Sequence, residues 1–513
     1  MGKDGKNTEI VLLAVIIILA IALRAWGLGF DLPYIFHPDE PVYILISQNI
    51  FKTGDLNPHF FNYPSLFFYL NAIAYIPYFL LGKMLGILHT AQDILPPITL
   101  AMGVTNAQIS STVILGRTLT LIFGTGIVYL TFLVGKQISN KTSVGLVAAL
   151  ISAISPTLVI HSRFVTPDTF VTFFTLFALL LSCLVFQQGK TWHYVLAGFL
   201  VGLSASSKYN GGLIIFALLL AHFLRHRKNS FKVHQIYISL MCCGIGFIAT
   251  TPYSILDFQK FTLDLLSEAR HYATGHAGME GNTLRWYLGY LWNTSGILYI
   301  IATLGILIGF IKYPKETGIL AIFPIMYFFF INTFSVRNDR TVLPMLPFLF
   351  VLASWSVVYM NQLLFLRLGT PKMATRLGVV TLTSIIILIQ PVFTTIKSTH
   401  SLTLTNSRES ARLWISENIP KGSKIVLESY APYLEPEQFS VTGIGRMIDH
   451  SPDWFIEQGF EYMIFSQGMY GRFFADPERY STEVTLYNRL FEKFSLVRIF
   501  TEGGLEIRIY KAL

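Results

Sequence analysis

The sequence predicts an α-helical membrane protein that crosses the bilayer about eleven times and ends in a small α/β domain outside it. Hydrophobic residues make up 53% of the 513 residues and charged residues only 13%, whereas soluble domains carry roughly 25% charged residues. Apolar runs recur along the first 400 residues, and the composition then becomes polar. These observations predict a membrane domain over residues 1–399 and a separate domain over 400–513.

Eleven apolar segments are candidates for spans, because a span needs about 20 mostly apolar residues. The first resembles a signal peptide, but its apolar run is too long and no small-residue cleavage site follows it, so we predict a retained span. The candidate spans are 10–30, 113–134, 143–160, 168–186, 192–206, 209–224, 235–252, 286–311, 317–333, 341–361 and 377–394.

Residues 65–89 form a further apolar run that polar residues and Pro77 interrupt. If this run lies flat at the interface, the loops on one side of the membrane carry fourteen Lys and Arg against three acids. The loops on the other side then carry nine Lys and Arg against eleven acids. Basic loops stay in the cytoplasm. We therefore predict an interfacial helix at 65–89, a cytoplasmic N-terminus and an extracytoplasmic C-terminus, in a bacterial or archaeal cell membrane.

The C-terminal segment alternates between helix and strand patterns. Residues 407–418 are amphipathic and precede Pro420 and Gly422, which predicts a helix that ends there; residues 480–493 predict a second helix. Short runs of apolar and β-branched residues predict strands at 423–429, 461–466, 496–500 and 505–511.

Two adjacent carboxylates, Asp39 and Glu40, follow the first span. A partly desolvated carboxylate at a membrane interface can act as a general base. The alternative is helix capping, because Asp39 precedes a predicted helix over 42–51 and acids favour a helix N-terminus.

Cationic and acidic residues also lie at the predicted outer ends of later spans. Arginines suit bidentate phosphate contacts, and a lysine in the outer half of the bilayer is costly unless an anion pairs with it. The alternatives are interfacial anchoring, capping by Asp168 and an ion pair with Asp339. The candidates are Arg117, Arg163, Asp168, Lys208, Arg337 and Arg340.

The loop over 253–285 is long enough to act as a lid, and Tyr253, His271 and His276 are candidate substrate contacts. Two histidines five residues apart are poorly spaced for one metal on a helix face, so we predict no dedicated metal site and no certain cofactor, while a divalent metal stays open. The three cysteines lie inside apolar segments and predict no disulfide.

Acids and cations from separate loops thus converge on one predicted membrane face. A carboxylate that deprotonates a hydroxyl, and cations that stabilise a phosphate leaving group, form a complete set for glycosyl transfer from a lipid phosphate. A transporter or lipid flippase is the main alternative, but it would place ionisable residues near the midplane in repeated halves. A scaffold or receptor would leave the acids and Lys208 without a role.

Several stretches, in order along nearly the whole chain, resemble the GT-C glycosyltransferases, specifically the protein O-mannosyltransferase and aminoarabinose-transferase superfamily (glycosyltransferase family 39-like). The matching stretches are Pro38-Asp39-Glu40, Asn62-Tyr63-Pro64, Gly116-Arg117, Ser162-Arg163, Pro167-Asp168, residues 202–208, Arg340 to Pro347, and Arg408 to Ser429.

The resemblance implies a polyprenyl-phosphate sugar donor, a protein, lipid or glycan acceptor, contact with membrane lipids and no nucleic acid. It implies that Asp39 is the catalytic base, that Glu40 orients a substrate and that Asp168 assists. It assigns the phosphate to Arg117, Arg163, Lys208 and Arg340. One departure is Asn62-Tyr63, where some relatives carry a basic residue before the proline.

Overall fold

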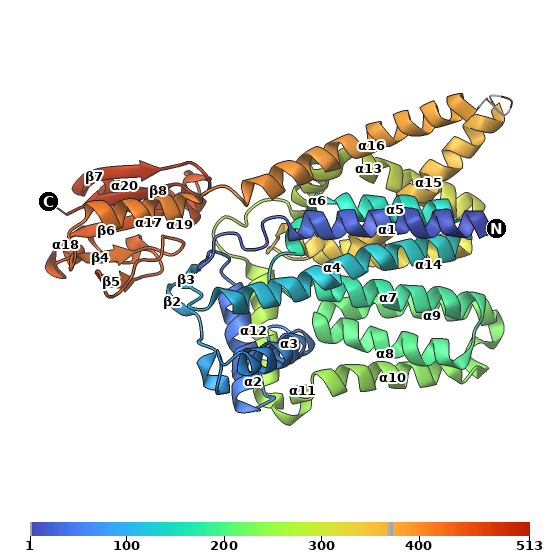
Figure 1. Ribbon diagram of the computed structural model, residues 1–513, viewed down its shortest axis with the longest axis horizontal. Helices are drawn as coiled ribbons and strands as arrows, with labels where there is room; N and C mark the ends of the chain where they lie inside the picture. The colour runs from blue at the N-terminus through green and yellow to red at the C-terminus, as the bar shows by residue number, and fades with distance from the viewer. Residues whose placement is uncertain (1–2, 368, 370–372, 513) are drawn as a thin grey trace.

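The computed structural model describes residues 3–367, 369 and 373–512. Its larger part is a bundle of helices that run roughly side by side, and a smaller α/β unit lies at one end (Figure 1). The N-terminus lies at the end of the bundle that is remote from this unit. Which membrane side each end faces stays a prediction.

All eleven predicted spans are helical in the described part of the chain. Their bounds are α1 (Lys3–Ala25), α4 (Ser110–Ser139), α5 (Thr142–Ile154) with α6 (Pro156–His161), α7 (Asp168–Gln187), α8 (Thr191–Ser207), η2 (Tyr209–Ile214) with α9 (Ile215–His226), α10 (Gln235–Thr250), α13 (Thr283–Lys312), α14 (Pro314–Ile331), η4 (Asp339–Met345) with α15 (Leu346–Arg367), and α16 (Met373–Ser401).

Among the described helices, eight are long and apolar enough to cross a membrane individually. One of the eight is α3 (Leu66–Met84), which the charge pattern predicts to be interfacial. Figure 1 draws α3 nearly end-on while the bundle helices run across the view. The arrangement therefore agrees with an interfacial helix, and it shows that hydropathy alone does not separate this helix from a span.

Helices also lie across the bundle axis at the end of the bundle that faces the outer unit. In Figure 1, α2 (Glu40–Thr53) and α12 (Phe258–Thr274) run perpendicular to the bundle helices. The other short elements are η1 (Ala91–Asp93), η3 (Arg227–Lys232), α11 (Tyr253–Leu256), and the strands β1 (Tyr34–Ile35), β2 (Ile98–Ala101) and β3 (Val104–Asn106), which pair in the order β1-β3-β2.

The C-terminal unit, which we call the outer unit, contains a five-stranded sheet in the order β5-β4-β6-β8-β7. Strand β4 is parallel to β5 and β6, whereas β8 is antiparallel to β6 and β7. Its elements are α17 (Ser407–Asn418), β4 (Lys424–Leu427), β5 (Ser440–Gly443), η5 (Met447–Asp449), α18 (Pro452–Glu457), β6 (Tyr462–Ser466), α19 (Gln467–Phe474), α20 (Ser481–Lys493), β7 (Ser495–Phe500) and β8 (Ile507–Lys511).

The predicted helices and strands of this unit are present, but β5, α18 and α19 are additions. Strand β5 has only four residues and ends in Gly443, so its sequence carries little strand signal. The unit also shares its core with the first loop, because Tyr34, Phe36 and Val104 pack into the cluster built around Ile425. The predicted boundary at residue 400 therefore does not separate two independent hydrophobic cores.

Candidate functional site

Four ionisable residues from distant parts of the chain meet where the bundle faces the outer unit. Asp39 Oδ2 lies 2.7 Å from Arg340 Nη2, and Arg340 Nε lies 3.8 Å from Asp168 Oδ2. Lys208 Nζ donates to Asp168 Oδ1 at 2.7 Å. We call this row Asp39–Arg340–Asp168–Lys208 the ion-pair chain. It brings together four of the predicted site residues.

Asp39 occupies the N-cap position of α2, yet its side chain makes no capping hydrogen bond. Its carboxylate contacts Arg340 instead, and its backbone N–H donates to His37 Nδ1 at 3.2 Å. Burial raises the pKa of Asp39, but the Arg340 guanidinium outweighs burial and holds that pKa below its ordinary value. Burial and the same arginine lower the pKa of His37 to about 4, so this ring is a neutral acceptor near pH 7. Asp39 is therefore a partly exposed, ionised carboxylate, and capping does not explain it.

Lys208 lies at the break between α8 and η2, where small residues allow a tight turn. Ser204 Oγ donates to the Gly211 carbonyl at 3.1 Å, and a Cβ on Gly211 would stand 2.6 Å from the Ser204 carbonyl oxygen. Glycine is therefore required for this close approach. The turn directs the Lys208 ammonium to Asp168, with the Tyr63 ring centroid 5.5 Å away.

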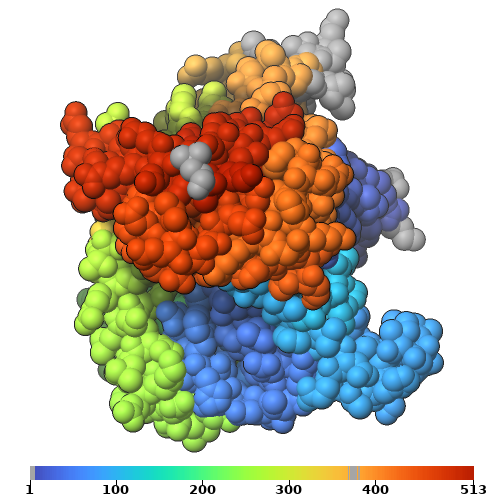
Figure 2. All heavy atoms as spheres, turned by 90° about the vertical axis from the view of Figure 1, so that its left-hand side faces the viewer, coloured from blue at the N-terminus to red at the C-terminus, as the bar shows by residue number. Residues whose placement is uncertain are grey.

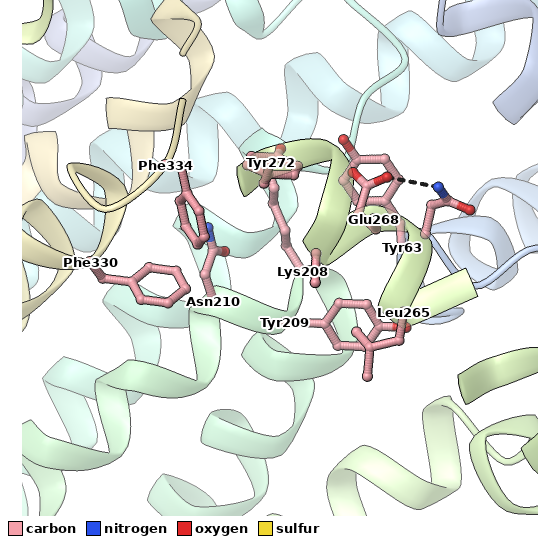
Figure 3. Close-up of a pocket in the computed structure, with 11 residues that line it drawn as sticks. Tyr63, Lys208, Tyr209, Asn210, Leu265, Glu268, Tyr272, Phe330 and Phe334 are labelled. Atoms are coloured by element: carbon pink, nitrogen blue, oxygen red, sulfur yellow. Dashed lines mark hydrogen bonds between the residues drawn. The ribbon is translucent and has the colours of Figure 1, made fainter. Parts of the chain in front are cut away.

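An apolar groove of about 150 Å³ begins at Lys208. In Figure 3, Lys208 lies between Phe330 and Phe334 on one side and Tyr209 and Leu265 on the other. Hydrocarbon lines most of the groove, and its charged lining residues are Lys208, which pairs with Asp168, and Glu268 at the side shared with the cavity. Such a surface suits a lipid chain that ends in an anion.

A larger cavity of about 590 Å³ contains Asp39 and Arg340 in its wall. This volume falls within the range of about 300–1,000 Å³ that small-molecule sites occupy. The cavity and the groove share four lining residues, Asn62, Tyr63, Glu268 and Tyr272. Figure 2 shows the outer unit above the first-loop segments and α12 on the face where the cavity lies.

Glu40 and Arg117 lie beside the ion-pair chain but bind each other. Arg117 Nε and Nη2 donate to the two Glu40 oxygens at 3.1 and 2.9 Å, and both side chains are 0% exposed. Arg117 Nη1 also donates to the carbonyls of Leu28 and Phe30, while the Val165 N–H donates to Glu40. The structure thus encloses the pair instead of presenting it to the cavity.

Arg163 is also buried and bonded to protein. Its Nε donates to the Arg24 carbonyl at 3.2 Å, and its Nη2 donates to the Leu23 carbonyl and to Thr399 Oγ1. These contacts tie the end of α1 to α16. Arg163 therefore lies outside the cavity lining and outside the ion-pair chain.

Arg337 holds the loop that precedes α13. Its guanidinium donates to the carbonyls of Gly281 and Glu280. The alternative partner considered from the sequence, Asp339, lies 3.2 Å from His161 Nε2. Arg337 is thus a loop contact that lines neither the groove nor the cavity.

His271 and His276 line the cavity, but Tyr253 does not. The two imidazole rings stack with centroids 5.8 Å apart. Within the described residues, no group of three or more His, Cys, Asp or Glu is arranged to hold a metal ion. The predicted lid is the amphipathic helix α12, whose Glu268 accepts from Asn62 Nδ2 at 2.7 Å.

The sequence patterns assigned no role to several cavity residues, among them Tyr63, Tyr272, Tyr430 and Arg472. Tyr63 occupies the position where a basic residue occurs in some relatives, and it faces Lys208. Tyr430 and Arg472 come from the outer unit, about 400 residues after Asp39 in the chain. No local sequence pattern predicts that Tyr430 and Arg472 line this cavity, because only the tertiary fold brings them there.

Comparisons with known proteins bear on the family and the fold of this chain. Residues 98–255 match the family model described as dolichyl-phosphate-mannose-protein mannosyltransferase. This region contains Arg117, Arg163, Asp168, Lys208 and Tyr253. No curated protein matches the chain.

Two solved structures share its fold at low sequence identity. The oligosaccharyltransferase AglB from Archaeoglobus fulgidus, in complex with an inhibitory peptide and a dolichol-phosphate, is 13% identical with a TM-score of 0.59; the match covers 98% of this chain and 74% of AglB. ArnT from Cupriavidus metallidurans, bound to undecaprenyl phosphate, is 11% identical with a TM-score of 0.55, covering 99% of this chain and 98% of ArnT.

The chain thus has the fold of the GT-C glycosyltransferases. Residues 98–255 also match the mannosyltransferase family model, so this region is similar to GT-C glycosyltransferases in sequence as well as in fold. The resemblance predicted from the sequence motifs is confirmed at this level.

Proposed function

We propose that this enzyme moves a sugar from a polyprenyl-phosphate-linked donor to a hydroxyl group of a protein, lipid or glycan acceptor at the extracytoplasmic membrane face. The observation that carries the proposal is the ion-pair chain, which runs from the cavity at Asp39 to the groove at Lys208. A polar cavity suits an acceptor hydroxyl, and an apolar groove with a cation suits a lipid-linked phosphate.

The donor class follows from the chemistry of the groove. A polyprenyl chain would lie along the side chains of Leu265, Phe330 and Phe334, and its phosphate would meet Lys208 and Arg340. The solved complexes of ArnT with undecaprenyl phosphate and of AglB with a dolichol-phosphate support this class. The identity of the sugar follows from none of these contacts.

The reaction proceeds with Asp39 as general base. The acceptor hydroxyl transfers its proton to the Asp39 carboxylate while its oxygen bonds to the anomeric carbon. The bond between that carbon and the phosphate oxygen breaks, and the polyprenyl phosphate departs with the bonding electrons. Attack from the side opposite the phosphate inverts the anomeric centre. The cations Arg340 and Lys208 stabilise the charge that develops on the leaving phosphate.

Arg340 also couples donor binding to the base. Its guanidinium lies 2.7 Å from Asp39 and holds the pKa of that carboxyl low, which weakens the carboxylate as a base. A donor phosphate competes for the same guanidinium. When Arg340 turns to the phosphate, Asp39 becomes more basic at the moment when a donor is present.

The direct test is Asp39→Asn, which keeps the size of the side chain but removes the base. We expect sugar transfer to fall by at least about 10²-fold, the contribution typical of a general base, with the protein still inserted and folded. The assay is transfer of labelled sugar from synthetic polyprenyl-phosphate donors by purified enzyme. The control is Asp55→Asn, an exposed carboxylate of the same loop. Full activity of the Asp39 variant would show that another group is the base.

The groove is tested by Lys208→Gln, which still offers Asp168 a hydrogen bond but removes the charge. We expect affinity for undecaprenyl phosphate to fall about tenfold or more, as for loss of a charged hydrogen-bond partner, while acceptor preference stays the same. Binding to protein in lipid nanodiscs is the measurement. Unchanged affinity would contradict the phosphate role of Lys208.

A further inference from the structure

The outer unit contributes a cation to the cavity wall that no carboxylate neutralises. Arg472 in α19 lines the cavity. Its Nε donates to the Gly468 carbonyl at 2.8 Å and its Nη2 donates to the Tyr430 hydroxyl at 2.9 Å. Among the described residues, no carboxylate oxygen lies within 4.0 Å of this guanidinium. Arg340, by contrast, has Asp39 and Asp168 as partners.

Tyr430, which holds Arg472, is itself fixed in an unusual backbone conformation. Its φ is +67°, a left-handed value that is uncommon outside glycine, and its N–H donates to the Met102 carbonyl at 2.9 Å. Two glycines make room for it. A Cβ on Gly103 would stand 2.8 Å from the Tyr430 ring, and a Cβ on Gly468 would stand 2.9 Å from its Cβ. Backbone strain of this kind concentrates at functional sites.

The charges around the cavity separate into two groups by position. Asp39 and Arg340, which neutralise each other, belong to the bundle side, and Glu268 of α12 accepts from Asn62. Among the described residues of the outer unit, Arg472 is the only charged one that lines the cavity, and the loop containing His276 lies beside it. This wall therefore has a net positive charge.

We propose that Arg472, positioned by Tyr430, is an anion-binding subsite for the acceptor, so that the accepting molecule carries a phosphate or carboxylate group near its reactive hydroxyl. The proposal rests on the proposed transferase function and names the acceptor class. A donor phosphate has its own cations, Lys208 and Arg340, beside the apolar groove. Arg472 lies on the wall of the outer unit, from which an acceptor approaches Asp39, and its unused Nη1 completes a bidentate contact.

The test measures binding of a small anionic probe to the full-length protein in neutral-lipid nanodiscs. The probe is radiolabelled glycerol 1-phosphate, and glycerol is the matched neutral compound, both measured by equilibrium dialysis. We expect the native protein to bind the phosphate ester in preference to glycerol. Arg472→Gln should weaken this binding by about tenfold or more, and Arg472→Lys should weaken it less.

Two further variants serve as a graded test and a control for the probe-binding measurement. Tyr430→Phe removes one hydrogen bond to Arg472 and should give an intermediate loss, while Arg479→Gln, an exposed arginine of the same unit, should bind the probe normally. Thermal unfolding of each variant checks its folding. Native-like binding by the Arg472→Gln protein, or absence of binding by the native protein, would overturn the proposal.

Donor binding separates the two sources of phosphate. Arg472→Gln should bind undecaprenyl phosphate as the native protein does, and an equal loss for both ligands would assign Arg472 to the donor and overturn the acceptor subsite. The proposed transferase function can fail independently of the anion subsite. If no polyprenyl-phosphate sugar is transferred while Arg472-dependent probe binding holds, the transferase proposal fails and the anion subsite stands.

Discussion

Asp39 shows how one arginine can set the properties of a carboxylate in a membrane enzyme. Burial alone would raise the pKa of Asp39 and favour its neutral form. Arg340, 2.7 Å away, reverses this effect and keeps the carboxylate ionised. The same guanidinium reaches toward Asp168. The position of Arg340 therefore controls the pKa of Asp39, the proposed base, and in the proposed mechanism also the charge available to a donor.

Replacing this arginine should move the pH dependence of transfer. The base must be ionised, so activity is lost as the pH falls through the pKa of Asp39. Arg340→Gln removes the charge that lowers this pKa, so the acid limb of the kcat/KM profile should shift to higher pH. Arg340→Lys retains the charge and should shift it less. Identical acid limbs in all three proteins would show that Arg340 does not control the base.

At the scale of elements, the start of helix α2 gives two adjacent carboxylates different surroundings. Successive helical residues point about 100° apart. Asp39 therefore faces the cavity, while Glu40 turns into the protein and meets Arg117 of α4. The buried pair fastens α2 to α4 and to the segment ending at Phe30. Glu40 thus fixes the start of the helix that carries Asp39, the proposed base.

The contact between Glu40 and Arg117 should contribute to the free energy of unfolding. Glu40→Ala leaves the Arg117 charge buried without its partner, and we expect the free energy of unfolding to fall by about 3–5 kcal/mol. The matched control is Arg446→Ala, which breaks the half-exposed ion pair with Asp449 and should cost about 1 kcal/mol or less. Chemical unfolding in detergent measures both. Equal losses of unfolding free energy in the two variants would show that burial does not determine how much the Glu40–Arg117 pair stabilises the protein.

At the scale of the whole molecule, the outer unit is built into the cavity and into the first loop. Tyr34 donates to Glu435 at 2.8 Å, and Arg408 lies 3.8 Å from the centre of the Phe36 ring. Arg472 and Tyr430 complete the cavity wall. The outer unit is therefore part of the site, and its stability bears on activity.

The stability of the outer unit should depend on pH through Glu428. This buried carboxyl accepts from Tyr487, Met447 and Ser466, and burial raises its pKa from 4.5 to about 7. Because the folded state holds the proton more tightly than the unfolded state, this contribution is complete below pH 4.5. It is lost as the pH rises toward 7, and the loss is on the order of 3 kcal/mol.

The measurement compares opening free energies of β4 and β6 by hydrogen exchange between pH 4.5 and 8, corrected for the intrinsic pH dependence of exchange. The native protein should lose stability with rising pH. Glu428→Gln, although less stable, should lack this component of the slope. An equal slope in both proteins would mean that Glu428 does not titrate in this range.

Several features followed from the sequence because their signals are local. Apolar runs of sufficient length predicted the bundle helices, and the loop charges predicted that α3 is interfacial, whereas its hydropathy alone is that of a span. The motifs around Asp39, Asp168, Lys208 and Arg340 named the members of the ion-pair chain. Residue types and spacing sufficed for these predictions, since solvent preference and charge are properties of short segments.

The tertiary structure alone decided which charges work together. Sequence could not tell that Glu40, Arg117 and Arg163 would bind protein groups, or that Arg472 of the outer unit would line the cavity of Asp39. A charged side chain gains its role from the partner that neutralises it, and over hundreds of residues only packing selects that partner. The sequence by itself thus determined the membrane environment, the positions of the helices and the kinds of chemical group present. The fold decided which charged groups bind other protein groups and which remain available to a substrate.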